Sequence, residues 1–149
     1  MIDQKNKKPW IVLITHGRFG EELKKSAEMI LGTLKDVYCF SLLEGMAPED
    51  LTTDLKKVLD TAPENTIIFT DLYGGTPSNI GTIFAIKNNY LVISGLNLPM
   101  LIEAEMMRSQ DNYEKIDEKL ISTGEEGIKN ITQIMKERKS QVDERNKVS

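Results

Sequence analysis

The chain has 149 residues, which corresponds to one domain, because domains have roughly 100–200 residues. Hydrophobic residues make up 40% and charged residues 28%, which is typical of a globular protein and excludes a disordered one. The formal net charge of −4 disfavours nucleic acid as a partner, and one cysteine and one histidine exclude an intrachain disulfide, a thiolate metal cage and a multi-histidine metal site.

No targeting segment is recognisable near the start of the chain. The apolar stretch at residues 11–14 is too short for the core of a signal peptide. No run of apolar residues approaches the roughly 18 that a membrane-spanning helix needs. We therefore expect a cytoplasmic protein.

Short β-branched runs alternate with helical patterns along the chain. Strands are predicted at residues 10–15, 37–43, 66–70 and 90–94. Helices are predicted at 19–31, at 48–59, from Thr76 to 87, at about 99–108 and at about 113–135. Thr76 is expected to be the N-cap of the third helix, and Pro77 fits its first helical position.

Four strand–helix repeats predict an α/β fold, a single doubly wound domain with a mostly parallel sheet and right-handed crossovers. The expected strand order is 2-1-3-4, which makes the first and third strands neighbours. The domain is expected to cover residues 1–135. Residues 136–149 have almost no apolar content, which predicts a charged tail that is frayed or linker-like.

Ligands of such sheets bind beyond the carboxyl ends of the strands, where the strand order reverses. The only histidine, His16, follows the first strand, and Asp71 follows the third. His16 is followed at once by Gly17 and then by a helix start, where backbone can approach an anion. This placement favours a nucleophilic imidazole beside a phosphate cradle over a plain loop histidine.

Two interpretations of Asp71 remain open at this point. The carboxylate caps a turn, or it accepts a hydrogen bond from one ring nitrogen of His16 and leaves the other nitrogen free to attack. The run Gly74-Gly75-Thr76 has two interpretations as well: a tight turn with a helix cap, or a phosphate-binding segment. In the second, backbone amides and the Thr76 hydroxyl donate to phosphoryl oxygens.

Other polar positions give weaker signals. Cys39 is expected to be a small core residue. Asn97 and Pro99 follow the fourth strand and are candidates to line the same crevice. Arg18 and Arg108 are expected to be solvated, with the steering of an acidic ligand or partner as the alternative. The sequence has neither of the usual glycine-rich nucleotide-binding motifs.

Three segments in combination, THGRFGEELKKSAEMILG, DLYGGTPSN and ISGLNLPMLIE, carry a family resemblance. From about Ile11 to Ile131 the chain resembles the enzyme IIA domain of the mannose/fructose/sorbose family of the bacterial phosphoenolpyruvate-dependent sugar phosphotransferase system (PTS). The resemblance implies that His16 accepts a phosphoryl group from the phosphocarrier protein HPr and passes it to a IIB component. It also implies that Asp71 supports His16 and that Thr76 contacts the phosphoryl group. The expected phosphate-binding glycines are Gly17, Gly74 and Gly75, with no cofactor and no metal.

Members of this family are typically homodimers that exchange an antiparallel edge strand, for which residues 127–134 are a candidate. Some relatives continue through a linker into a IIB domain; this chain stops at Ser149, so we expect IIB to be a separate protein. The resemblance further implies an indirect link to the membrane components IIC and IID, which choose the sugar. Mannose, fructose, sorbose and amino sugars all remain open.

Two alternatives are kept. A dihydroxyacetone kinase phosphotransfer subunit shares the fold and the histidine, although its relatives tend to lack the G-G-[ST]-P run found at residues 74–77. A non-catalytic regulator that senses phosphorylation would have the same residues. Transfer onward to a IIB protein distinguishes a carrier from a sensor.

Overall fold

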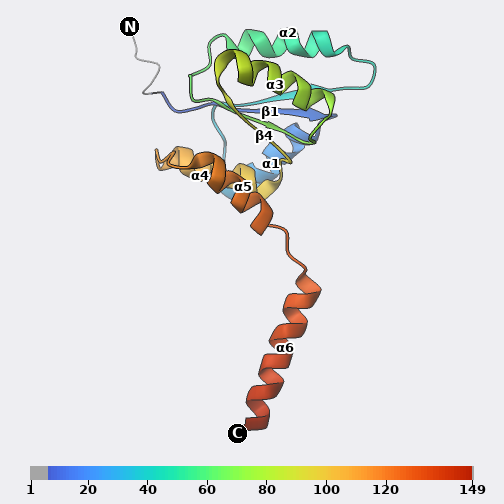
Figure 1. The fold of residues 1–149 in the computed structure, drawn as a ribbon, viewed down its shortest axis with the longest axis vertical. Coiled ribbons are helices and arrows are strands. Elements are labelled where there is room, and N and C mark those ends of the chain that lie inside the picture. The colour runs from blue at the N-terminus through green and yellow to red at the C-terminus, as the bar shows by residue number, and fades with distance from the viewer. Residues whose placement is uncertain (1–6, 149) are drawn as a thin grey trace.

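Four parallel strands form the central sheet in the order β2-β1-β3-β4 (Figure 1). They are β1 (Ile11–His16), β2 (Val37–Leu42), β3 (Ile67–Thr70) and β4 (Leu91–Ser94). The predicted order is confirmed, and the strand bounds differ from the prediction by about one residue. The computed structural model describes residues 7–148, so residues 1–6 of the predicted domain and Ser149 of the predicted tail lie outside the described residues.

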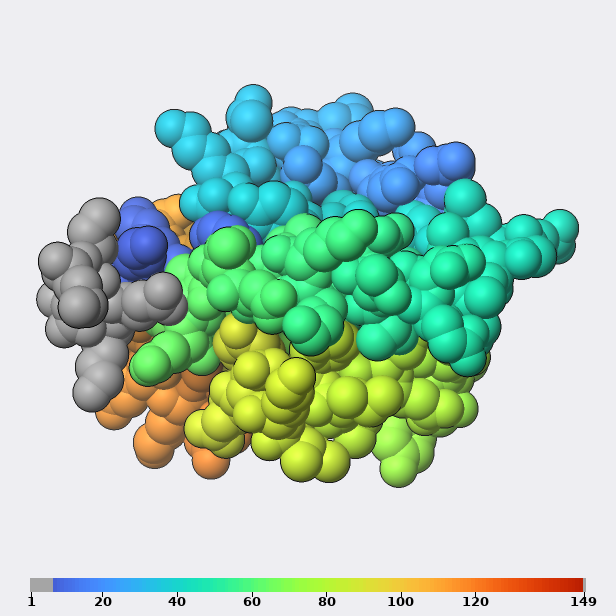
Figure 2. Space-filling view, turned by 90° about the horizontal axis from the view of Figure 1, so that it is seen from above, coloured from blue at the N-terminus to red at the C-terminus, as the bar shows by residue number. Residues whose placement is uncertain are grey.

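Helices cover both faces of this sheet (Figure 1). One face packs against α1 (Phe19–Leu31), α4 (Leu98–Ser109) and α5 (Ile116–Glu126). The other face packs against α2 (Pro48–Leu59) and α3 (Thr76–Asn88), which lie side by side in Figure 2. The protein is therefore the doubly wound α/β domain that the alternation of strands and helices predicts.

The central strand β1 explains why two separate cores form. Successive side chains of a strand point to opposite faces, so Ile11 and Leu13 join the core under α1, α4 and α5. Val12 and Ile14 join the core under α2 and α3. All four are fully buried, and each such side chain contributes roughly 1.5–3 kcal/mol to folding.

The segment after α4 differs from the prediction of one helix over 113–135. The structure has two helices there, α5 and α6 (Ile131–Val148), separated by residues 127–130. The prediction of an edge strand at 127–134 is wrong, because these residues end α5, form the link and begin α6. Within residues 7–148 the sheet has four strands.

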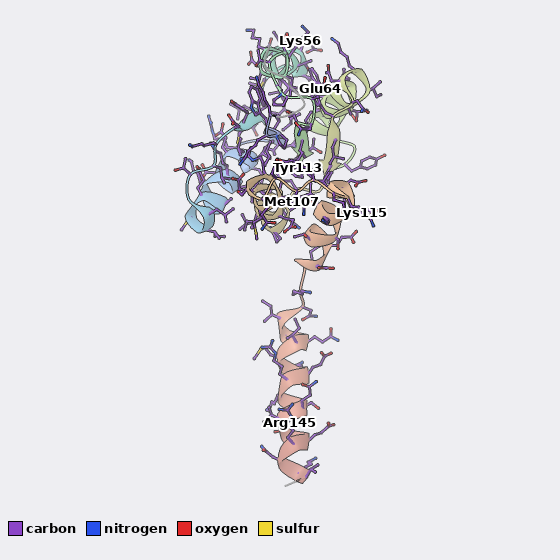
Figure 3. All side chains as sticks on the ribbon, turned by 90° about the vertical axis from the view of Figure 1, so that its left-hand side faces the viewer. Lys56, Glu64, Met107, Tyr113, Lys115 and Arg145 are labelled. Carbon is purple, nitrogen blue, oxygen red and sulfur yellow. The ribbon has the colours of Figure 1, made fainter. Side chains whose placement is uncertain are left out.

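Helix α6 extends away from the domain (Figures 1 and 3). It has no buried residue, and its side chains, Arg145 among them, extend outward along its whole length. The tail predicted as frayed is thus helical up to Val148, because it is rich in Lys, Arg, Glu and Gln, which are good helix formers. Its linker-like role stays a prediction. No helix within residues 7–148 has the length and apolar character needed to cross a membrane.

Arg108 corrects another expectation. Its side chain is neither solvated nor near a ligand crevice: the residue is only 4% exposed and lies at the amino end of the sheet. The guanidinium donates to the backbone carbonyls of Pro9, Lys35 and Asp36, and it pairs with Glu105. Three carbonyls and one carboxylate satisfy the buried charge, so Arg108 ties α4 to the beginnings of β1 and β2.

Candidate functional site

His16 and Asp71 meet at the carboxyl edge of the sheet. His16 is the last residue of β1, and Asp71 directly follows the neighbouring strand β3. One carboxylate oxygen, Asp71 Oδ2, accepts a hydrogen bond from the His16 backbone amide at 2.8 Å and lies 2.9 Å from His16 Nδ1. The structure thus brings together the two residues that the strand-end rule singles out.

The contact with Asp71 determines what the His16 ring can do. A carboxylate accepts hydrogen bonds only, so Nδ1 carries the proton in the neutral ring and Nε2 carries the lone pair. The His16 side chain is 48% exposed, whereas that of Asp71 is 16% exposed. The imidazole is therefore held from the protein side and remains accessible to a large reactant.

Gly75 supports the same ring from another direction. A Cβ atom added there would lie 2.8 Å from His16 Cε1 and 3.4 Å from Nε2, so the imidazole rests against bare backbone. The preceding residue, Gly74, has φ +84°, in the left-handed region that favours glycine. The two glycines therefore serve different ends, since one turns the chain and the other makes room for the ring.

The first turn of α3 offers hydrogen-bond donors near His16. Its first backbone bond runs from the Asn79 amide to the Gly75 carbonyl at 3.0 Å, so the amides of Gly74, Gly75 and Thr76 precede the intrahelical bonds. The N-cap is Gly75, and no side chain caps the helix, which corrects the prediction that Thr76 is the N-cap. The chain is already helical at Thr76, so its hydroxyl is not used for capping.

The backbone amide of Gly17 is not free to donate a hydrogen bond to a ligand. Its amide donates to the Leu42 carbonyl at 2.8 Å, and its φ of +54° turns the chain out of β1. The amide of Gly20 is engaged as well, by Thr15 Oγ1 at 3.0 Å. Any contact of Gly17 with a phosphate would therefore come from the close approach of its backbone and not from its N–H.

The remaining candidates have contacts of their own. The side chain of Asn97 accepts from the Met100 amide as the N-cap of α4 and donates to the Gly124 carbonyl, and that it lines the crevice stays a prediction. Pro99 lies against Gly127 at the end of α5. Arg18 is exposed, as expected, and pairs with Glu21 at 3.0 Å.

The surroundings of Glu21 and of Cys39, near α1, shift the pKa values of these two groups. The hydrogen bond from Arg18 lowers the pKa of Glu21. Cys39 on β2 packs against the core under α1, as expected, and burial raises the pKa of its thiol to about 11. The thiol is therefore protonated near neutral pH and is not a nucleophile there.

Exposed apolar side chains surround the site. Leu72 and Tyr73 follow Asp71, and Tyr73 is 89% exposed. Phe19 on α1 and Ile83 on α3 are also exposed. A groove of about 590 Å³ runs between α2 and α3 and is lined by Pro48, Thr52, Thr76, Asn79, Ile80 and Ile83, among others. Thr76 thus belongs both to this groove and to the first turn of α3.

A hydroxyl network beside Asp71 has no counterpart in the predicted site. Thr70 Oγ1 lies 2.7 Å from Ser78 Oγ, and Ser78 Oγ donates to the Leu72 carbonyl. Ser78 lies in the segment DLYGGTPSN but was given no role there, and its contact with Thr70 depends on how α3 packs on β3. Within the described chain, no group of three or more His, Cys, Asp or Glu residues is arranged to hold a metal ion.

Comparison with known proteins identifies PTS components as the proteins to which the chain is similar. The family model described as "PTS system fructose IIA component" matches residues 10–121. The PTS system mannose-specific EIIAB component of Escherichia coli strain K12 is 36% identical over 125 residues, which are 80% of this chain and 38% of that protein. The chain thus spans well under half the length of that relative.

Two solved structures share the fold. A crystal structure of phosphotransferase system component EIIA from Streptococcus agalactiae superposes with a TM-score of 0.77 at 29% identity, covering 83% of this chain and 98% of that one. The mannose/sorbose specific IIA subunit of the phosphotransferase system from Enterococcus faecalis gives a TM-score of 0.72 at 29% identity, covering 83% and 95%.

Proposed function

The chain belongs to the family of PTS fructose IIA components, phosphotransferases of sugar uptake, and we propose that His16 is the residue that carries its phosphoryl group. The observation that carries the proposal is the 2.9 Å contact between Asp71 Oδ2 and His16 Nδ1, which leaves Nε2 with the lone pair. An exposed imidazole with one nitrogen held by a carboxylate suits a nucleophile that must meet a second protein.

In the proposed reaction, phospho-HPr is the donor. The lone pair of Nε2 attacks phosphorus in line, and the bond from phosphorus to the HPr nitrogen breaks, with its electron pair returning to HPr. The proton on Nδ1 stays hydrogen-bonded to Asp71, whose charge stabilises the positively charged phosphoimidazole. Transfer to a IIB component follows the same steps in reverse, with a nucleophile of IIB as acceptor.

The first turn of α3 is the proposed binding site for the phosphoryl oxygens. The charge of a loose transition state spreads over three oxygens, and aligned donors stabilise it. The amides of Gly74 and Gly75 and the hydroxyl of Thr76 supply such donors, and the positive end of the α3 dipole adds to them. Gly17 lets the backbone approach closely. The exposed apolar rim suits brief docking of HPr and of IIB.

The wider partners follow from the family. We propose IIB of the same transporter as the acceptor and the membrane components IIC and IID as indirect partners, which would place the reaction in the cytoplasm. The site handles only a phosphoryl group, so the choice of sugar is assigned to the membrane components.

We also propose that the protein is a homodimer that uses the free edge of β4. Among residues 7–148, β4 pairs with β3 alone, and an unpaired edge is a template for a further strand. A groove of about 590 Å³ lies along it, lined by Tyr73, Thr82, Leu91, Val92 and Ser94, among others. Sedimentation at micromolar concentration should give twice the mass of the chain, and a monomer at all concentrations would contradict this.

The function is tested by incubating the protein with phosphoenolpyruvate, enzyme I and HPr. We expect an acid-labile, base-stable phosphoryl label on the wild type and none on His16→Ala. Adding a IIB component of the family should then remove the label from the protein. Equal labelling of His16→Ala would refute the proposal, and a label that IIB does not remove would favour a phosphorylation sensor over a carrier.

A further inference from the structure

We propose that Ser78 is a positioning residue for His16, because its hydroxyl holds the chain on both sides of Asp71. The inference rests on the proposed function, since it concerns the same imidazole. Ser78 lies in the first turn of α3, is 8% exposed, and its hydroxyl bonds to Thr70 and Leu72 rather than to the ring. It is expected to act through Asp71.

The hydrogen bonds of Ser78 have a defined direction. A serine hydroxyl has one proton, and Ser78 Oγ donates it to the Leu72 carbonyl. Thr70 Oγ1, at 2.7 Å, must therefore donate to Ser78 Oγ. Thr70 is fully buried, so each of these polar groups relies on its protein partner.

Thr70 and Leu72 are the two residues that flank Asp71. Ser78 thus fixes the chain immediately before and immediately after the carboxylate that holds His16. The same turn of α3 begins beside Gly75, whose backbone supports the imidazole. One helical turn therefore sets both supports of the ring.

The carboxylate itself has little else to orient it. Asp71 Oδ2 makes both contacts with His16, whereas Asp71 Oδ1 is buried and has no hydrogen-bond partner in the described chain. A carboxylate bound through one oxygen can pivot unless its backbone is fixed. The bonds of Ser78 to Thr70 and Leu72 supply that restraint.

The experiment compares Ser78→Ala, which removes the hydroxyl, with Ser78→Thr, which keeps it. The chain has one histidine, so ¹⁵N NMR of its imidazole reports the protonation of Nδ1 and Nε2 of His16 without ambiguity. We expect Ser78→Ala to raise the fraction of the tautomer with its proton on Nε2 and to slow phosphoryl uptake from phospho-HPr about tenfold, since small misplacements of reacting groups are costly. Ser78→Thr should restore both values toward wild type.

Thr66→Val is the matched control. Thr66 is also a fully buried hydroxyl, but it lies just before β3 at the opposite end of the sheet, and its Oγ1 has no hydrogen-bond partner in the described chain. Its replacement should leave the tautomer and the uptake rate unchanged. Sedimentation of each variant confirms that the oligomeric state is the same.

A Ser78→Ala protein with a wild-type tautomer and uptake rate would overturn the proposal, even if its melting temperature falls. Should Ser78→Ala fail to fold, Ser78→Cys keeps the size of the side chain with a weaker donor. An unchanged tautomer in that variant would overturn the proposal equally. The tautomer is measured without a phosphoryl donor. If the wild type failed to take up a phosphoryl group, the proposed function would be refuted, but the NMR comparison would still decide whether Ser78 positions His16.

Discussion

The imidazole of His16 is held by two neighbours, the Asp71 carboxylate and the bare backbone of Gly75. The first is predictable from sequence, because both residues follow strands of one parallel sheet. The second is not, since it depends on how the loop folds back over the ring. The same applies to Gly17, whose amide is taken by Leu42 on the neighbouring strand.

Replacing Asp71 by Ala should slow phosphoryl uptake about 100-fold in a folded protein, because Nδ1 loses its acceptor and the phosphoimidazole loses its counter-charge. The rate is measured with phospho-HPr and compared with Asp54→Ala, which removes an exposed carboxylate on α2. Rates equal to wild type would reduce Asp71 to a turn residue.

Gly75→Ala tests the second support of the ring. The backbone of Gly75, at φ −87° and ψ 172°, suits alanine, but the added methyl group would lie 2.8 Å from His16 Cε1 and must displace the imidazole. We expect uptake to fall about tenfold with little loss of stability. Unaltered imidazole NMR signals and an unaltered rate would contradict the contact.

The Cys39 thiol should react slowly in the native protein. Burial raises its pKa to about 11, so the thiolate is scarce at pH 8 and grows as the pH rises toward 11. A disulfide reagent such as DTNB should therefore label the native protein far more slowly than the urea-unfolded chain. Equal rates for the two states at pH 8 would refute this assignment.

At the scale of elements, hydrophobic periodicity predicts the four strands and the first four helices, because their apolar residues match the faces that the sheet buries. It does not separate α5 from α6. Ile128, Ile131 and Ile134 recur every third residue, which is closer to a helical than to an extended pattern. That spacing accounts for the absence of a strand at 127–134.

The expectation of a solvated Arg108 is wrong because three partners of its guanidinium are backbone carbonyls, which a sequence pattern does not reveal. Arg108→Ala should lower the free energy of unfolding by about 3–5 kcal/mol, since Glu105 and three carbonyls lose their partner in a buried place. Urea unfolding measures this. The control Arg18→Ala breaks an exposed pair and should change stability by less than about 1 kcal/mol. Similar small losses of unfolding free energy in both variants would contradict the role of Arg108 in tying α4 to the beginnings of β1 and β2.

At the scale of the whole molecule, one α/β domain carries the site and α6 stands apart from it (Figure 1). Composition predicts that the tail does not join the core, because it has almost no apolar residues. The same composition favours a helix, since Lys, Arg, Glu and Gln are good helix formers, but a helix without a buried face depends on propensity alone.

Truncation after Asn130 should therefore leave the domain intact. Helix α6 has no buried residue, so its removal exposes no core, and the melting temperature should change by less than about 2 °C. Phosphoryl uptake on His16 should also persist. A drop in melting temperature of more than about 5 °C would show that α6 contributes to the fold.

The central claim is that Asp71 holds Nδ1 of His16 and leaves Nε2 to carry the phosphoryl group. The most direct test is ³¹P and ¹⁵N NMR of the phosphorylated, ¹⁵N-histidine-labelled protein, in which the single histidine gives an unambiguous assignment. The account predicts that phosphorus is bonded to Nε2, with Nδ1 still protonated. Phosphorus on Nδ1 would contradict it.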